Sequence, residues 1–389
     1  MRWLRELKMP RSLKVDVNPT VFKWLRISSG WSVEEVSKRL NTSVDVIKSV
    51  EIGTWQPTLL QLKELSNAYK RPLALFFLTI PLDEPSLPKD YRLLPDKKDV
   101  FDKKTISTIR KARCLQEIGG ELLSNMNTNV SPKIDHVSLL KDPTDIGEYY
   151  RNQFSVKMDM QQGFKSSYAF LDYLRETCEN LNILVFQFPM PVEDVRGFVL
   201  TDRNPNVIVI NSKDTIEARI FTLLHEFGHI LLRETAIDLP IISLNKKNRI
   251  ESWCNQFAAS FLLPETHAET LFRNEKTLTD KRTLDRLSKK FKVSRSMLLY
   301  SMFKQEFITK DEFEQKLETY RPSKEPQKKK TTKTGGIPQE KKCLREMGQK
   351  FVSMVANNYD KNYINYTDAL RFLSVKSRNF DKVLAKAKQ

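Results

Sequence analysis

The feature that most constrains this 389-residue chain is a pair of histidines four residues apart within an apolar stretch. Residues 225–229 read HEFGH, and most of their neighbours on both sides are large apolar residues. A helix places residues i and i+4 one turn apart on the same face, so His225 and His229 can hold one metal ion between them. Polar groups on a buried helix need partners, and a metal ion supplies them. The spacing therefore predicts a metal site on a buried helix over residues 216–232.

The third ligand has to come from elsewhere in the chain, because catalytic zinc sites commonly use three protein ligands and keep one position open. Glu251 is the preferred candidate, since it opens a second helical pattern over residues 249–263. The small residues Gly228 and Ala258 would let the two helices approach closely. Alternatively, Glu251 is only a solvated charge that the helix dipole favours.

The chemistry of such a site suits hydrolysis of a peptide bond. Two imidazoles and one carboxylate favour Zn²⁺, with Mn²⁺ as the alternative, and zinc lowers the pKa of a bound water and polarises a carbonyl group. Glu226, about 100° around the helix from His225, is placed to accept the water's proton as catalytic base and to pass it to the leaving amine. His267 is the rival third ligand, or a residue that lines the cleft and stabilises an oxyanion. The strand pattern at 207–211 could add a substrate peptide at its edge.

The organisation around these helices is mixed. Short β-branched and aromatic runs at 182–187, 197–200 and 206–210, separated by turn residues, predict a small sheet ahead of the histidine-bearing helix. Nearly all other segments with periodic apolar residues follow helical spacing. The middle of the chain is therefore expected to be an α+β region within a mainly helical protein.

Residues 17–80 show the pattern of a bundle of short helices. The segment 32–40 begins with a serine N-cap, has Glu35 three residues later and spaces its apolar residues for one face. A second helix follows after a tight turn, which is the helix-turn-helix pattern. This second helix would offer five side chains to a DNA groove: Ser43, Val44, Asp45, Lys48 and Ser49.

These five side chains leave the partner of residues 17–80 open. They include no Arg, Gln or Asn, the residue types that read bases through paired hydrogen bonds, and Asp45 would face phosphates unfavourably. The region could therefore bind DNA or a partner protein. A homodimer would suit paired DNA half-sites only if this region binds DNA.

Changes in composition give the remaining boundaries. Four prolines between residues 81 and 95 indicate an extended linker, and a lysine-rich polar stretch after residue 320 indicates a flexible one. A second possible helix-turn-helix pattern lies at 284–298. The predicted domains are a helix-turn-helix domain at 1–80, a linker at 81–100, a metallopeptidase domain at 101–270, a helical extension at 271–320, a basic linker at 321–342 and a C-terminal helical domain at 343–389.

The formal net charge of +17 is concentrated at the two ends of the chain. Residues 324–389 contain 16 Lys and Arg against 6 Asp and Glu, and residues 1–80 contain 13 against 7. Basic ends around a nearly neutral middle suit a polyanion such as nucleic acid. The alternative is that solvated lysines serve only solubility.

Cysteine usage and hydropathy indicate the compartment. The four cysteines are far apart and form no CxxC pair, so a disulfide framework is not expected. The longest apolar run, at 73–80, is too short to span a bilayer, and the N-terminus lacks the apolar core of a signal peptide. We therefore expect a cytoplasmic protein without a membrane partner.

Several of these motifs resemble a known family. FTLLHEFGH at 221–229, ESWCNQFAA at 251–259 and LLP at 262–264 resemble the ImmA/IrrE metallopeptidases, as do VRGF at 195–198 and VIVIN at 207–211. Residues 17–80, with WQPT at 55–58, resemble an XRE-type (Cro/repressor-like) DNA-binding domain. The subfamily that fuses the two modules is similar over nearly the whole chain. The fold class implied is mainly α with an α+β zincin-like metallopeptidase core, an N-terminal helix-turn-helix bundle and a helical C-terminal region.

The resemblance implies regulatory proteolysis by an HExxH, gluzincin-like metallo-endopeptidase. Such proteins are encoded in mobile elements, phage remnants and stress-response loci, and they cut a repressor or antitoxin to release transcription. His225, His229 and Glu251 would then be metal ligands and Glu226 the catalytic base. Two alternatives stay open. One is a non-proteolytic DNA-binding regulator with a structural or sensory metal site, and the other is an antitoxin-like protein that docks a partner on its basic C-terminus.

Overall fold

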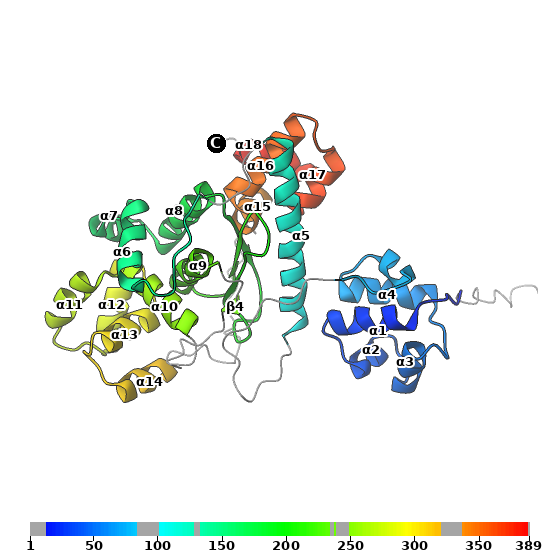
Figure 1. Ribbon diagram of the computed structural model, residues 1–389, viewed down its shortest axis with the longest axis horizontal. Coiled ribbons are helices and arrows are strands. Elements are labelled where there is room, and N and C mark those ends of the chain that lie inside the picture. The colour runs from blue at the N-terminus through cyan, green and yellow to red at the C-terminus, as the bar shows by residue number, and fades with distance from the viewer. Residues whose placement is uncertain are drawn as a thin grey trace, which may run out of the picture. The chain divides into compact units, whose positions relative to one another are not determined.

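The computed structural model describes residues 13–83, 101–127, 133–233, 237–238, 249–319 and 337–387 (Figure 1). The first twelve residues, on which the signal-peptide argument rests, and most of the two predicted linkers at 81–100 and 321–342 lie outside the described residues. Contacts divide the chain into two compact units, and the division falls after Arg110, inside helix α5 (Lys103–Asn125). No helix in the described part of the chain is long and apolar enough to cross a membrane.

The first unit is a bundle of short helices with the predicted caps. Ser32 accepts a hydrogen bond from the backbone of Glu35, whose side chain accepts one from the backbone of Ser32, so the start of α2 is capped reciprocally. Ser43 caps α3. A role of this unit in DNA binding stays a prediction. Its elements are α1 (Pro19–Ser28), α2 (Val33–Arg39), α3 (Val44–Glu51), α4 (Leu59–Tyr69) and the short 3₁₀ helix η1 (Leu73–Phe77).

The second unit is built around a small mixed sheet with the strand order β1-β3-β2-β4. β1 (Leu184–Phe188) pairs parallel to β3 (Val207–Asn211), and β2 (Gly197–Leu200) pairs antiparallel to β3 on the other side. β4 (Ile237–Asp238) adds two residues to the outer edge of β2. The three predicted strands are confirmed to within two residues at each end.

The prediction that residues 207–211 offer an open strand edge is wrong. β3 is paired on both sides, because Val207 lies beside Leu184 of β1 and beside Leu200 of β2. The parallel pairing of β1 with β3 skips over β2 in the sequence, and such a crossover leaves no local sequence signal. The outer strands of the described sheet are β1 and β4.

One face of the sheet packs against the helix that carries the histidines. α9 (Ile216–Leu231) and α8 (Ser167–Asn180) share a core with side chains on this face of the strands. α10 (Arg249–Leu262) packs against α9 and against α6 (Pro143–Gln153), as Figure 1 shows. The same part of the unit contains α7 (Met158–Gly163), α11 (Glu265–Arg273), α12 (Lys281–Phe291), α13 (Arg295–Lys304) and α14 (Lys310–Thr319).

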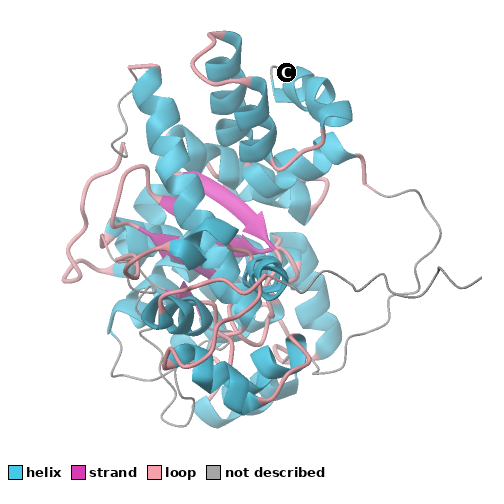
Figure 2. Cartoon of the chain, turned by 90° about the vertical axis from the view of Figure 1, so that its right-hand side faces the viewer, coloured by secondary structure: helices cyan, strands magenta, loops and turns pink. Residues whose placement is uncertain are grey.

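Helix α5 and the C-terminal helices cover the opposite face, so helices lie on both sides of the strands (Figure 2). Phe186 of β1 meets Phe351 edge-on, with ring centroids 5.5 Å apart. Asn358 donates a hydrogen bond to the carbonyl of Leu122 in α5 at 3.0 Å. The predicted C-terminal helical region therefore shares a core with the sheet, whereas the predicted domain limits stay predictions. Its helices are α15 (Gln339–Met347), α16 (Gln349–Asp360), α17 (Tyr366–Leu373) and α18 (Ser377–Ala387).

A buried charged junction fixes this C-terminal layer to α8. Arg175 and Glu179 of α8 form a buried ion pair at 3.2 Å, and the backbone of Lys350 donates to Glu179 at 2.9 Å. Arg175 also donates to the carbonyl oxygens of Leu344 and Arg345. Burial raises the pKa of Glu179 and lowers the pKa of Arg175, so each side chain depends on the other to remain charged.

The second predicted helix-turn-helix pattern, at 284–298, forms two helices that do not expose a groove-reading face. α12 and α13 are joined through Lys292, whose backbone is left-handed with a φ of 58°. Residues 297–302 of α13 are buried in the core of the second unit. A recognition helix has to present its side chains to a DNA groove. α13 is therefore a packing helix.

Candidate metal centre

Two helices of the second unit bring the three predicted ligands together. His225 and His229 lie one turn apart on α9, and Glu251 lies in the first turn of α10. The Nε2 atom of His225 lies 3.3 Å from Oε2 of Glu251, and the Nε2 atom of His229 lies 3.2 Å from Oε1. The two Nε2 atoms are 3.2 Å apart. All three side chains are buried, with Glu251 the most exposed at 3%.

Close packing of α9 on α10 explains why these atoms converge. Gly228 faces α10 so closely that an added Cβ atom would lie 3.2 Å from Sγ of Cys254 and 3.3 Å from the ring of Phe257. Ala258 is fully buried. The predicted close approach of the two helices is confirmed at Gly228, and the predicted burial of the histidine helix is confirmed along almost its whole length.

The distances between the donor atoms of these three side chains match a tetrahedral metal ion. Ligand atoms about 2.0–2.1 Å from a tetrahedral zinc ion lie about 3.3–3.4 Å from one another. The two imidazole Nε2 atoms are 3.2 Å apart, and each lies 3.2 or 3.3 Å from a different oxygen of the Glu251 carboxylate. Within the described residues, these are the three His, Cys, Asp or Glu side chains whose ligand atoms all come within 4.8 Å of one another. Both the spacing and the donor set fit zinc.

Glu226 lies beside this cluster and against the sheet. Its side chain is fully buried on α9. Gly197, the first residue of β2, approaches so closely that an added Cβ atom would lie 3.1 Å from Oε1 of Glu226 and would overlap the methyl group of Thr222. Strand β2 therefore runs directly past the predicted catalytic base, and a residue without a side chain is needed at its start.

Sequence reasoning missed the role of Gly197 beside this carboxylate and the role of Asn211 at the end of β3. The side chain of Asn211, at the end of β3, accepts a hydrogen bond from the backbone of Met190 at 3.1 Å and donates one to the carbonyl of Val195 at 2.7 Å. Asn211 thereby holds the loop that leads into β2. An asparagine at the end of an otherwise apolar strand is the signal that could have identified it, because a buried amide needs hydrogen-bond partners.

Replacement of Gly197 by alanine tests the close approach of β2. We expect Gly197→Ala to lower the free energy of unfolding by about 1–3 kcal/mol, because the new methyl group has to displace buried Thr222. Urea unfolding of the purified protein measures this change. The matched control is Gly163→Ala, since a Cβ atom at Gly163 meets nothing within 4 Å. Equal stability of the two variants would contradict the tight contact.

The other predicted site residues are dispersed. His267 is exposed in the first turn of α11 and is not part of the three-residue cluster, so the cluster needs no ligand from it. Its role in a cleft stays a prediction. In α3, Asp45 and Lys48 are exposed, Val44 and Ser49 are half-buried, and the hydroxyl of Ser43 is engaged as the N-cap.

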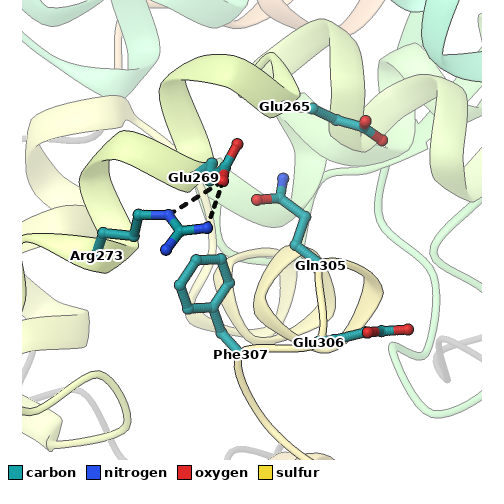
Figure 3. Close-up of a pocket in the computed structure, with 6 residues that line it drawn as sticks. All are labelled: Glu265, Glu269, Arg273, Gln305, Glu306 and Phe307. Atoms are coloured by element: carbon teal, nitrogen blue, oxygen red, sulfur yellow. Dashed lines mark hydrogen bonds and ion pairs between the residues drawn. The ribbon is translucent and has the colours of Figure 1, made fainter.

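A cavity of about 380 Å³ lies apart from this cluster, between α11 and the end of α13 (Figure 3). None of its lining residues is one of the predicted ligands. Arg273 in its wall pairs with Glu269 at 2.7 Å. The metal centre is therefore not identified by cavity size, but by the convergence of donor atoms. The cavity is lined by Glu265, Glu269, Arg273, Gln305, Glu306 and Phe307.

Two comparisons with known proteins found similarities to this chain. The Peptidase M78 family model, described as an IrrE N-terminal-like domain, matches residues 178–303. The radiation response metalloprotease IrrE of Deinococcus radiodurans is 40% identical over 110 residues, which are 27% of this chain and 33% of that protein. The chain thus matches about a third of the length of that relative. Residues 178–303 contain both histidines of the cluster, Glu226 and Glu251, and their similarity to an IrrE N-terminal-like domain supports a metallopeptidase.

Proposed function

We propose that the second unit is a zinc-dependent, gluzincin-like endopeptidase in which His225, His229 and Glu251 hold the metal ion. The observation that carries this proposal is the spacing of 3.2–3.3 Å between the two buried imidazole nitrogens and from each of them to a carboxylate oxygen of Glu251 on a second helix. Burying two imidazoles and a carboxylate without a cation has a high desolvation free energy. A bound cation offsets that free energy. Mn²⁺ is the second choice of metal.

The proposed chemistry assigns one role to each side chain. A zinc ion held by these three side chains would supply a water of lowered pKa and would polarise the scissile carbonyl. Glu226 accepts a proton from the attacking water and returns it to the leaving amine. The turn of helix between His225 and His229 fixes the two imidazoles, while Gly197 leaves room for the Glu226 carboxylate beside β2. Burial of all four polar side chains keeps bulk water away from the carboxylate.

The proposed substrate is a regulatory protein, such as a repressor or antitoxin, in the cytoplasm. The likeness of 110 residues of this chain to a protein named as a radiation response metalloprotease supports a regulatory role for proteolysis. The first unit would deliver the peptidase to its substrate by binding DNA or a partner protein. A homodimer would fit paired DNA half-sites if the first unit binds DNA.

Metal analysis of purified protein tests the site directly. We expect about one zinc ion per chain in the wild type and loss of that ion in Glu251→Ala, because three protein ligands are typical of a catalytic zinc site. Glu176→Ala is the matched control, since Glu176 is an exposed glutamate of α8 in the same unit. Absence of metal from the wild type would remove the proposal. Metal retained in Glu251→Ala would place the third ligand elsewhere.

A further inference from the structure

The last two helices of the described chain are joined by a short turn. α17 ends at Leu373 and is followed by its C-cap Ser374, which adopts a left-handed conformation with a φ of 53°, and α18 begins at Ser377. The turn between α2 and α3 has the same feature at Asn41, with a φ of 49°. Both turns thus redirect the chain within a few residues, which leaves the second helix of each pair with one packed face and one outer face.

The packed face of α18 is a continuous apolar ridge. Phe380, Val383, Leu384 and Ala387 are buried, at the spacing of one helix face. The ring of Phe380 lies edge-on to Tyr359 and Tyr366, with centroids 5.3 and 5.0 Å away. This packing fixes the rotation of α18 about its own axis, and therefore fixes which side chains face outward.

The outer face of α18 is a basic ridge. Arg378, Lys382 and Lys386 are exposed and follow one another at four-residue intervals, with exposed Lys376 just before the helix. A four-residue step along a helix is about 6 Å. Between residues 361 and 387 there are six Lys and Arg against two Asp, and one of those acids, Asp368, already pairs with Arg371 at 3.0 Å. The other acid, Asp381, is exposed on α18 between Arg378 and Lys382, so the ridge combines three bases of the helix and Lys376 with one acid. The ridge therefore carries an excess of positive charge.

The corresponding helix of the first unit lacks this property. The exposed charges of α3 are one acid, Asp45, and one base, Lys48. Helix α2 adds Glu34 and Glu35 in its first turn and Lys38 and Arg39 in its last turn. A phosphate backbone would meet balanced charge there, whereas at α18 it would meet more bases than acids.

We propose that the outer face of α18 is a binding surface for double-stranded DNA, with Lys376, Arg378 and Lys382 contacting phosphates. A single convex helix with its long axis exposed matches the major groove, which is about 12 Å wide and admits an α-helix. Single-stranded nucleic acid is instead bound in grooves that track the backbone and offer bases a stacking platform. The surface is independent of the metal centre, and the proposal holds whether or not the second unit is a peptidase.

Fluorescence anisotropy tests the proposal. It measures the binding of the full-length chain to a short DNA duplex of mixed sequence at several salt concentrations. We expect the triple variant Lys376→Ala, Arg378→Ala, Lys382→Ala to bind roughly 10–100-fold more weakly. The slope of log K against log salt should become shallower by about 0.9 for each phosphate that the variant no longer neutralises. All three side chains are exposed, so the thermal unfolding midpoint should stay unchanged.

The matched control removes the same charge from another basic helix. Lys281, Arg282 and Lys289 are exposed on α12, and their triple replacement by alanine should leave DNA affinity within about threefold of the wild type. An equal loss of DNA affinity in both triple variants would reveal a general effect of net charge and would overturn the assignment to α18. The assignment would also be overturned if the α18 variant bound DNA as tightly as the wild type, or if the wild type did not bind the duplex. Loss of DNA binding in Lys48→Ala alone would overturn it as well.

Discussion

Replacing Glu226 by glutamine should abolish peptide-bond cleavage while the protein keeps its metal ion. Glutamine preserves the length of the side chain but cannot accept a proton from the attacking water, and general base catalysis contributes about 10²–10⁴-fold to a rate. The Glu226 oxygens are not among the clustered donor atoms of His225, His229 and Glu251, so zinc content should stay near one ion per chain. Mass spectrometry of new protein N-termini, in cells that express either form, measures cleavage of any cellular protein that serves as substrate.

The control for this experiment is Glu176→Gln, which makes the same chemical change at an exposed position of the same unit. New N-termini should appear with this control and with the wild type, but not with Glu226→Gln. If an effect on transcription survives unchanged in Glu226→Gln, the alternative of a non-proteolytic regulator with a structural or sensory metal site becomes the better account. Loss of zinc from Glu226→Gln would instead show that this carboxylate supports the metal centre itself.

Ending the chain before Ile337 should prevent the second unit from folding. The truncation removes α15 to α18 and exposes the face of the sheet that Phe351 covers through its contact with Phe186. It also leaves Arg175 and Glu179 without the backbone groups that they bind in α15 and α16. Each large apolar side chain returned to water costs about 1.5–3 kcal/mol, and domains are stable by only about 5–15 kcal/mol. We expect insoluble protein, or no cooperative thermal transition by calorimetry.

A single substitution tests the contribution of this contact without shortening the chain. Phe351→Ala should lower the free energy of unfolding by about 3–5 kcal/mol in the full-length protein, because Phe351 is 1% exposed. Phe77→Ala, at a side chain that is 49% exposed, should change it by about 1 kcal/mol or less. If the truncated chain had the thermal unfolding midpoint of the wild type, the C-terminal helices would contribute nothing to the stability of the second unit.

The metal centre was predictable from sequence because its main constraint is local. Two histidines four residues apart share a helix face whatever the rest of the chain does, and a glutamate that opens a second apolar helix is a plausible third ligand. Glu251 required one further assumption, that two helices distant in sequence pack together. Gly228 provided the physical reason for that assumption, since only a small residue allows the observed approach.

Strand pairing and the second layer of helices were not predictable in the same way. The runs at 182–187 and 206–210 indicated strands, but nothing in them specified that β1 and β3 would be neighbours, so the predicted open edge of β3 was wrong. The C-terminal helices showed amphipathic patterns without a named partner. An apolar helix face indicates that the face is buried, but it does not indicate against which element. Only the fold identifies the sheet as that element.

Helix α6 was missed for a different reason. Its sequence is polar, and Gly147 weakens a helical interpretation. Asp142 as N-cap and Pro143 at the first position are the start signals that could have identified it. Gly147 is required because an added Cβ atom would lie 2.8 Å from the carbonyl oxygen of Phe257 in α10. The residue that obscured the helix is therefore the one that lets it pack against the ligand-bearing helix.

The position of α15 and α16 on the back of the sheet has a consequence for how the protein is made. Ribosomes add about 5–20 residues per second, so α16 follows β3 by roughly 7–30 s. Once Glu251 has been added, the nascent chain contains all three ligands, yet the face of the sheet opposite α9 still lacks its C-terminal helices. The proposed peptidase would therefore mature only late in translation, and incomplete chains on the ribosome would be inactive toward their regulatory target.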